Sequence, residues 1–309
     1  MARVTSPGHK LGQDIGTKFL ENFFSPRLTS LAEELGDFYC DKKGHRPSVR
    51  GKKKKVSWED AYGNLHDLDF VIEKGGSFEH QGNPAAFIEL AWRRYTKHAR
   101  NKVGEIEAAL IPLKNTYQKS CSFSGVIWAG VVTPGALKQL QSHGIYVLFI
   151  DYHKVVDSFL TKNVNLDYPE DATNDFKHDL LKSLENLSES DMHDIERIFE
   201  ELIKEEYDEF IASLKDCISR KIERVILLPL YGEKITFESI SDALLAINDY
   251  EILHPTEMKF QKFEIIIKYS NGDNIDGSFR TKEDATQFLE IIKQLNLSKV
   301  KNSQSKLID

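Results

Sequence analysis

Two short stretches in the N-terminal half of the sequence decide the expected fold: residues 65–73 read LHDLDFVIE, and residues 85–92 read AAFIELAW. In the first stretch apolar and acidic residues alternate, which is the period of two that places successive side chains on opposite faces of a β-strand. The second stretch is a short apolar run after Pro84, typical of a buried strand. We therefore predict two strands that each carry acidic side chains within an apolar pattern.

Hydrophobic periodicity predicts the elements around these strands, with a period near 3.6 for helices and 2 for strands. In chain order, the expected elements are a helix at residues 10–35 broken near Pro26, strands at 54–61, 65–73 and 85–92, a helix at 95–113, a strand at 124–133, a helix from Pro134 to near Gly144 and a strand at 146–151. The last strand, helix and strand imply two parallel strands with a right-handed crossover. We therefore expect an α/β fold with a mixed sheet flanked by helices.

The sequence changes in character after residue 160. The expected elements there are helices over 176–222, a strand at 223–230, a helix at 237–248, a hairpin of strands at 263–269 and 274–279 around Asn271-Gly272, and a helix from about residue 282. Thr281 followed by Asp284 fits a capping box for that last helix. No internal repeat is evident from the pattern. We expect three parts, namely a core at residues 1–160, an acidic helical segment at 161–222 and a small α+β region at 223–309.

Composition excludes several classes of protein. Hydrophobic residues make up 40% of the chain, which leaves enough material for a packed core and excludes a mostly disordered protein. No apolar run approaches the ~18 residues that span a bilayer, and the N-terminus lacks the apolar region of a signal peptide. Three widely spaced cysteines, Cys40, Cys121 and Cys217, argue against a disulfide framework or a structural zinc site. We expect a soluble protein of a reducing cytoplasm, without a membrane partner.

The net charge of −7 hides a strong asymmetry along the chain. Residues 41–55 contain eight basic residues and one acid, and residues 92–102 contain five basic residues and no acid. Residues 166–210, in contrast, contain sixteen acids and four bases. A local basic cluster is the feature expected of phosphate binding, whatever the total charge. The alternative for the lysines at 52–55 is a solvated loop.

Carboxylates on the two central strands predict a metal site. Period two places Asp67 and Asp69 on one face of their strand and Glu89 on one face of the next. If these strands are neighbours, Asp69 and Glu89 converge. Two carboxylates beside basic clusters suit Mg²⁺, a hard ion that prefers oxygen ligands and keeps several waters. Such an ion lowers the pKa of a bound water and stabilises charge on a phosphoryl oxygen.

The order of elements and the acidic motif resemble the PD-(D/E)XK nuclease superfamily, the fold of restriction endonucleases. The resemblance covers roughly residues 10–152 and rests on Asp69 at the end of Asp67-Leu68-Asp69 and on Glu89 in Phe87-Ile88-Glu89-Leu90-Ala91. It implies a restriction-endonuclease-like sheet and a nuclease-like catalytic core at residues 1–160. The element order carries more of the resemblance than the degenerate motif does.

The resemblance also implies roles for individual residues. Asp69 and Glu89 would hold Mg²⁺, and Glu21 resembles the extra acid that some members place near the metal from their first helix. The family usually has Lys two positions after the second acid, and this chain has Ala91 there. Some members recruit that Lys from elsewhere, so Lys97, in the basic run that follows, is the expected third catalytic residue.

The implied activity is a metal-dependent DNA endonuclease that hydrolyses phosphodiester bonds, with a type II restriction enzyme as its specific form. Double-stranded DNA is the expected partner, and restriction enzymes of this fold are often dimers, so a homodimer is consistent with the resemblance. Loss of the usual lysine leaves open a non-catalytic DNA-binding or assembly protein on the same fold, and a DNA repair nuclease is a further alternative. The residues expected to contact DNA phosphates are Lys52, Lys53, Lys54, Lys55, Arg93, Arg94 and Arg100.

The basic loop yields a test that uses salt. Each phosphate neutralised by a protein cation contributes about 0.9 to the slope of log K against log[salt]. Replacing Lys52, Lys53, Lys54 and Lys55 together by Ala should therefore flatten that slope by roughly one to four, with affinity falling alike for all sequences. Fluorescence anisotropy at several salt concentrations measures both quantities. An unchanged slope and affinity would mean that the four lysines form only a solvated loop.

Overall fold

The computed structural model describes residues 6–229, 233–253 and 262–296. The chain divides into two compact units, residues 1–214 and 215–309, and each is described by itself. The acidic helices lie mostly in the first unit, although the last of them, α8 (Glu189–Ile218), runs past its boundary. None of the helices in the described part of the chain combines the length and hydrophobicity that a bilayer crossing needs.

A five-stranded mixed sheet forms the centre of the first unit, in the order β1-β4-β5-β6-β7. Its strands are β1 (Phe38–Lys42), β4 (Phe70–Lys74), β5 (Asn83–Arg93), β6 (Phe123–Gly130) and β7 (Tyr146–Ile150). The pairs β1·β4 and β4·β5 are antiparallel, whereas β5·β6 and β6·β7 are parallel. The predicted α/β class and the predicted parallel pair β6·β7 are thereby confirmed.

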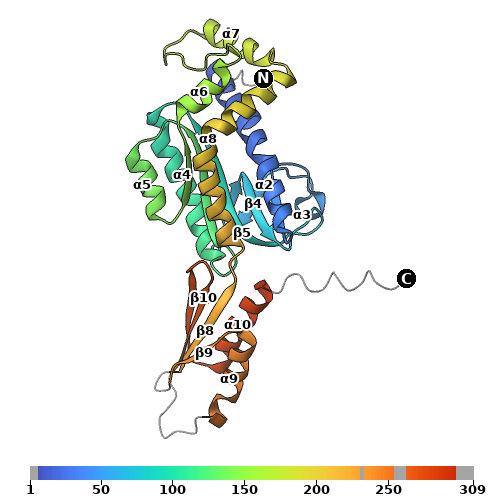
Figure 1. The fold of residues 1–309 in the computed structure, drawn as a ribbon, viewed down its shortest axis with the longest axis vertical. Helices are drawn as coiled ribbons and strands as arrows, with labels where there is room; N and C mark the ends of the chain where they lie inside the picture. The colour runs from blue at the N-terminus through green and yellow to red at the C-terminus, as the bar shows by residue number, and fades with distance from the viewer. Residues whose placement is uncertain (1–5, 230–232, 254–261, 297–309) are drawn as a thin grey trace, which may run out of the picture. The chain divides into compact units, whose positions relative to one another are not determined.

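Helices cover both faces of this sheet (Figure 1). The helices of this unit are α1 (Pro7–Gln13), the π-helix η1 (Asp14–Glu21), α2 (Asn22–Leu35), α3 (Pro47–Arg50), α4 (Thr96–Thr116), α5 (Pro134–Ser142), α6 (Tyr152–Leu160), α7 (Asn174–Glu185) and α8, although α7 packs on α1. The helices α4 and α5 lie on one face, against β5, β6 and β7. The π-helix η1, α6 and α8 lie on the other face.

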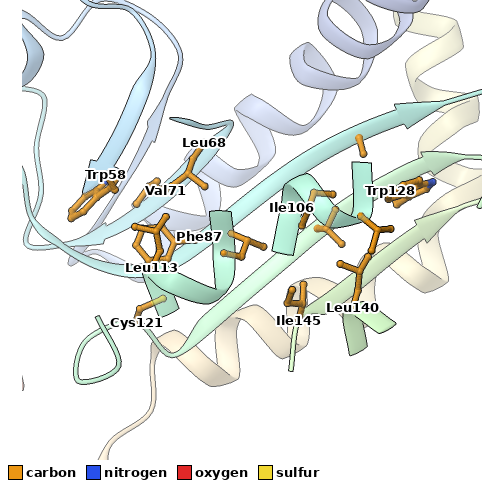
Figure 2. Packing of buried hydrophobic residues seen from close by; sticks show 14 of the residues in the cluster. Trp58, Leu68, Val71, Phe87, Ile106, Leu113, Cys121, Trp128, Leu140 and Ile145 are labelled. Carbon is orange, nitrogen blue, oxygen red and sulfur yellow. The ribbon is translucent and has the colours of Figure 1, made fainter. Parts of the chain in front are cut away.

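The core under α4 is built from the predicted apolar stripe. The five stripe residues, Ala99, Val103, Ile106, Leu110 and Leu113, are all buried, which confirms the helical prediction. They pack against sheet residues that include Val71 and Phe87 (Figure 2). The central strand β5 is therefore sandwiched between α4 on one face and η1 on the other.

Aromatic rings fill the opposite face. Phe19 of η1 contacts Phe159 of α6 and Phe199 of α8, with ring centroids 4.8 and 5.1 Å apart. Phe210 of α8 approaches β6 at Gly125, where an added Cβ would lie 3.0 Å from its ring. The missing side chain at Gly125 allows α8 to lie close against the sheet.

Two sequence predictions about chain breaks are wrong. The strand predicted at 65–73 is two strands, β3 (Leu65–Leu68) and β4, separated by a bend at Asp69. The first of them pairs with β2 (Val56–Glu59) in a separate two-stranded sheet. The helix predicted to break near Pro26 instead continues through it in α2, because burial of the neighbouring Phe23, Phe24 and Leu28 outweighs the missing N–H of proline. The strand β1 and the helices α3 and α6 were not predicted from the sequence.

The second unit is a four-stranded antiparallel sheet in the order β11-β10-β8-β9, with two helices packed on it. Its elements are β8 (Ile222–Pro229), β9 (Ile235–Phe237), α9 (Ile240–Leu253), β10 (Phe263–Tyr269), β11 (Asn274–Phe279) and α10 (Lys282–Asn296). The predicted hairpin at Asn271-Gly272 is confirmed, as is the cap in which the Asp284 amide donates to Thr281 Oγ1 at 3.1 Å. Two strands followed by a helix thus occur twice, as β8-β9-α9 and as β10-β11-α10, and β8 pairs with β10 at the centre of the sheet. The sequence pattern did not reveal this repeat.

A buried network of charges fixes the edge of the first sheet. The guanidinium of Arg46 donates to both carboxylate oxygens of Glu73, at 2.8 and 2.9 Å, and lies 2.9 Å from Asp41. Arg50 donates to Asp41 as well, at 2.7 Å. Arg46 and Glu73 are almost fully excluded from solvent. Because each carboxylate in this network has a paired guanidinium, its role is structural.

Arg46→Met tests that role. Removing one partner of a buried ion pair leaves uncompensated charge and costs about 3–5 kcal/mol. We therefore expect the free energy of unfolding in urea to fall by about that amount. Arg197→Met is the matched control, because Arg197 forms an exposed pair with Glu201 within α8, and such pairs contribute only about 0–1 kcal/mol. Equal effects of the two substitutions would contradict a structural role for the network.

Candidate functional site

The bend at Asp69 places its carboxylate beside the central strand β5. Phe70 pairs with Ile88, so one further step along both chains sets Asp69 opposite Glu89. Here β3 turns away toward β2, and the Leu90 amide donates to Asp69 Oδ2 at 2.7 Å. A side-chain carboxylate thereby replaces the main-chain acceptor that a continued strand would supply, and the backbone amide is satisfied.

Glu89 lies on the face of β5 that α4 covers. It is buried, and its Oε2 lies 3.3 Å from the Nζ of Lys102, which projects from α4. Lys102 also lies 3.8 Å from Glu105, one turn further along the helix. The structure thus brings together the two predicted carboxylates and Lys102, a lysine of the predicted basic run that was expected to matter less than Lys97.

The electrostatics of this group are those of crowded, poorly solvated acids. Burial raises the pKa of Glu89 to about 7, and the Asp69 charge adds to the rise, while Lys102 opposes it. Burial also raises the pKa of Asp69 against the opposing effects of the Leu90 hydrogen bond, Lys102 and Lys43. Burial is thus the largest cause of both shifts, and the two lysines offset it only in part. Perturbed carboxyl groups of this kind are typical of functional sites.

Glu21 lies at the edge of the same group. Burial raises the pKa of Glu21; Lys43 lowers it, and Asp69 raises it. Glu21 and Asp69 line one pocket together. Sequence reasoning counted Lys43 within the basic cluster but did not select it for the site. Lys43 directly follows β1, and because that strand was not predicted, the sequence did not indicate that Lys43 lies near the site.

Lys97, the expected catalytic lysine, has a different partner in the structure. Its ammonium pairs with Glu170, and both side chains are more than half exposed. Ala91, at the usual lysine position of the resembled family, is buried under α4. Since Lys102 contacts Glu89, the geometry places Lys102, rather than Lys97, at the carboxylates.

The predicted phosphate-binding residues fall into two groups. Lys52, Lys53, Lys54 and Lys55 are exposed on the loop before β2, and Arg100 is exposed on α4. Lys55 pairs with Asp67 at 2.5 Å. Arg93 and Arg94 are partly buried, and Arg94 donates to the hydroxyls of Tyr152 and Tyr95 at 3.0 and 2.6 Å. The donors of Arg94 are thus engaged within the protein, whereas the exposed loop is accessible to a partner.

The donor set fits one kind of metal better than others. Within the described ranges, no cluster of three or more His, Cys, Asp or Glu side chains is spaced to hold an ion, which disfavours a closed zinc site. Asp69 and Glu89 offer two hard oxygen donors with excess negative charge. A cation bound by one or two carboxylates, water and substrate phosphate is the usual state of Mg²⁺.

Comparisons with known proteins add little to this geometry. No known family model and no curated protein matches the chain. A solved structure described as "Protein of Unknown Function AF1548" is similar at 12% identity over 62% of this chain and 98% of that chain, with a TM-score of 0.27. A likeness at this level carries no argument about fold or function.

The raised pKa of Glu89 predicts a pH-dependent stability. Because the pKa is about 7 in the folded chain against an ordinary 4.5, the folded state holds its proton more tightly than the unfolded state. The stability from this proton is complete below about pH 4.5 and is lost as the pH rises through about 7, a change of roughly 3 kcal/mol.

Glu89→Gln stays neutral and should escape that loss. We expect the free energy of unfolding of the variant, relative to that of wild type, to rise by up to roughly 3 kcal/mol between about pH 4.5 and pH 8. Urea unfolding of both proteins across this range, with a chelator present, measures the difference. A difference that is independent of pH would show that Glu89 titrates normally in the folded protein.

Proposed function

We propose that the protein is a metal-dependent DNA endonuclease of restriction-endonuclease-like fold, which hydrolyses phosphodiester bonds in double-stranded DNA. The observation that carries the proposal is the meeting of Asp69 and Glu89 at the centre of a mixed sheet, with Lys102 3.3 Å from Glu89. Two carboxylates and a lysine are the set that the resembled nucleases use, and here the lysine comes from a helix instead of the strand.

Each residue has a distinct role in this proposal. Asp69 and Glu89 would hold Mg²⁺, which supplies an activated water and stabilises charge on the phosphate oxygens. The Leu90 amide fixes Asp69 through its hydrogen bond. The ammonium of Lys102 opposes the rise in the pKa of Glu89, and it would orient the attacking water and stabilise negative charge on the phosphate oxygens. Glu21 would add negative charge at the rim.

The exposed lysines would supply affinity rather than chemistry. Lys52, Lys53 and Lys54 have exposed side chains on a loop, where they can reach backbone phosphates that carry no sequence information. We propose a restriction-type activity on intact duplex as the specific form. A repair nuclease would instead prefer damaged or branched DNA, and a non-catalytic protein would bind without cutting.

Plasmid cleavage in Mg²⁺ tests the proposal. Asp69→Asn and Glu89→Gln should each abolish cleavage while DNA binding stays equal or becomes tighter, because each removes a charge that repels phosphate. Asp67→Asn is the matched control: it is a carboxylate two residues away in the same motif, but it pairs with Lys55 and Ser57. Full activity in the first two variants, or loss in all three, would contradict the assigned site.

The lysine is tested separately. Lys102→Ala should lower the cleavage rate by at least ~10², the lower end for groups that act on protons. Lys97→Ala should change the rate little, since its partner is the exposed Glu170. Single-turnover cleavage at saturating protein separates the rate from binding. A large effect of Lys97→Ala with a small effect of Lys102→Ala would return the role to Lys97.

A further inference from the structure

A pocket of about 610 Å³ opens beside Asp69 in the first unit. Its walls come from α1 and η1, from the end of β5 with the start of α4, and from residues 166–177. The volume lies within the roughly 300–1,000 Å³ that small-molecule sites occupy. Since Asp69 belongs both to this wall and to the candidate site, the pocket adjoins the place where the scissile phosphate would bind.

One wall of the pocket is a helix face that carries glycines in place of larger side chains. Gly8, Gly12 and Gly16 line it, although glycine within a helix is less stable than alanine. An added Cβ would make an ordinary contact with Lys177 at 3.8 Å at Gly8 and would meet Trp92 at 3.4 Å at Gly16. At Gly12 an added Cβ would meet nothing within 4 Å. The space kept open by Gly12 is therefore the pocket itself.

Aromatic rings form another part of the wall, and they are held in place. Trp92, Tyr95 and Tyr168 line the pocket. The Arg94 guanidinium lies over the Tyr168 ring at 3.3 Å and donates to the Tyr95 hydroxyl, while the Trp92 ring stacks on Tyr152 with centroids 5.8 Å apart. Rings fixed before a ligand arrives are suited to stacking on nucleic-acid bases.

Polar groups complete the lining. Gln13 and Thr17 are exposed on the glycine wall, and Lys177 lies beside it. A glutamine amide can form two hydrogen bonds with the edge of a base. The lining thus combines aromatic rings, the Gln13 amide, four Lys and Arg side chains and the carboxylates of Glu21, Asp69 and Glu170, of which we assign Asp69 to the metal.

We propose that this pocket accepts one unstacked nucleotide of the DNA substrate, next to the phosphate that is cleaved. The inference rests on the proposed function and names as substrate DNA with an unpaired or extruded nucleotide at the cleavage site, which favours the repair form of that activity over restriction of intact duplex. Taking a nucleotide out of the helix costs a few kcal/mol, and the cost is least when it is already unpaired.

The test compares two oligonucleotide duplexes that each contain one 2-aminopurine nucleotide. This nucleotide is paired in one duplex and unpaired in the other. Cleavage in Mg²⁺ and 2-aminopurine fluorescence are measured for wild type, Gly12→Leu and Gly135→Leu in the full chain. Gly135 is the matched control: it is an exposed helical glycine, in α5, whose added Cβ also meets nothing within 4 Å. Gly12→Ala, a smaller filler, serves as a second variant, and thermal melts check that each variant folds.

The wild type should cut the duplex with the unpaired nucleotide at least about tenfold faster, in keeping with ~1–3 kcal/mol for one stacked base. Gly12→Leu should lose this preference, Gly12→Ala should lose part of it, and Gly135→Leu should keep it. Equal cleavage of the two duplexes, or a preference for the unpaired nucleotide that survives both Gly12 substitutions, would overturn the proposed role of the pocket. The nuclease proposal would stand in either case. Failure to cut either duplex overturns both.

Discussion

The hydrogen bond from the Leu90 amide to the Asp69 carboxylate is the constraint on which the candidate site depends. It forms where β3 leaves the sheet, and it takes the place of a main-chain pair between that strand and β5. One interaction thus satisfies a backbone donor, holds Asp69 in place and sets it opposite Glu89. The bend at Asp69 and the position of the carboxylates are consequences of the same contact.

Buried charge in the first unit is of two kinds. Around Arg46, carboxylates and guanidinium groups are matched, and hydrogen bonds join them in fixed pairs. Around Glu89, acids outnumber their near cations, and burial raises the pKa of Glu89 to about 7. The first arrangement stabilises the fold, whereas the second leaves charge for a ligand to compensate. This contrast supports the assignment of chemistry to the second group.

The sequence predicted those features that local patterns determine. The stripe from Ala99 to Leu113 and the alternation around Asp69 each reflect burial of one face, so α4 and the convergence of two acids could be foreseen. The bend at Asp69 could not, because the alternating pattern continues through it. The pairing of Arg46 with Glu73 joins residues far apart in the chain, and no local pattern encodes it.

The choice between the two lysines, in contrast, could have been made from the sequence. Lys97 and Lys102 both lie on α4, but five residues place them about 140° apart around the helix axis. Which of them faces Glu89 depends on how α4 packs on the sheet, through Val103 and Ile106. The predicted stripe through Ala99, Val103 and Ile106 fixes that rotation, because at 100° per residue Lys102 lies beside the stripe and Lys97 lies nearly opposite it.

The central claim, that Asp69 and Glu89 bind a divalent cation, is tested most directly by calorimetric titration of the full chain with Mn²⁺, a substitute for Mg²⁺ that prefers the same oxygen ligands. The account predicts saturable binding in wild type and in Asp67→Asn, and its loss in Asp69→Asn and Glu89→Gln. Binding that persists in both of the latter variants, or is absent from the wild type with and without DNA, would contradict it.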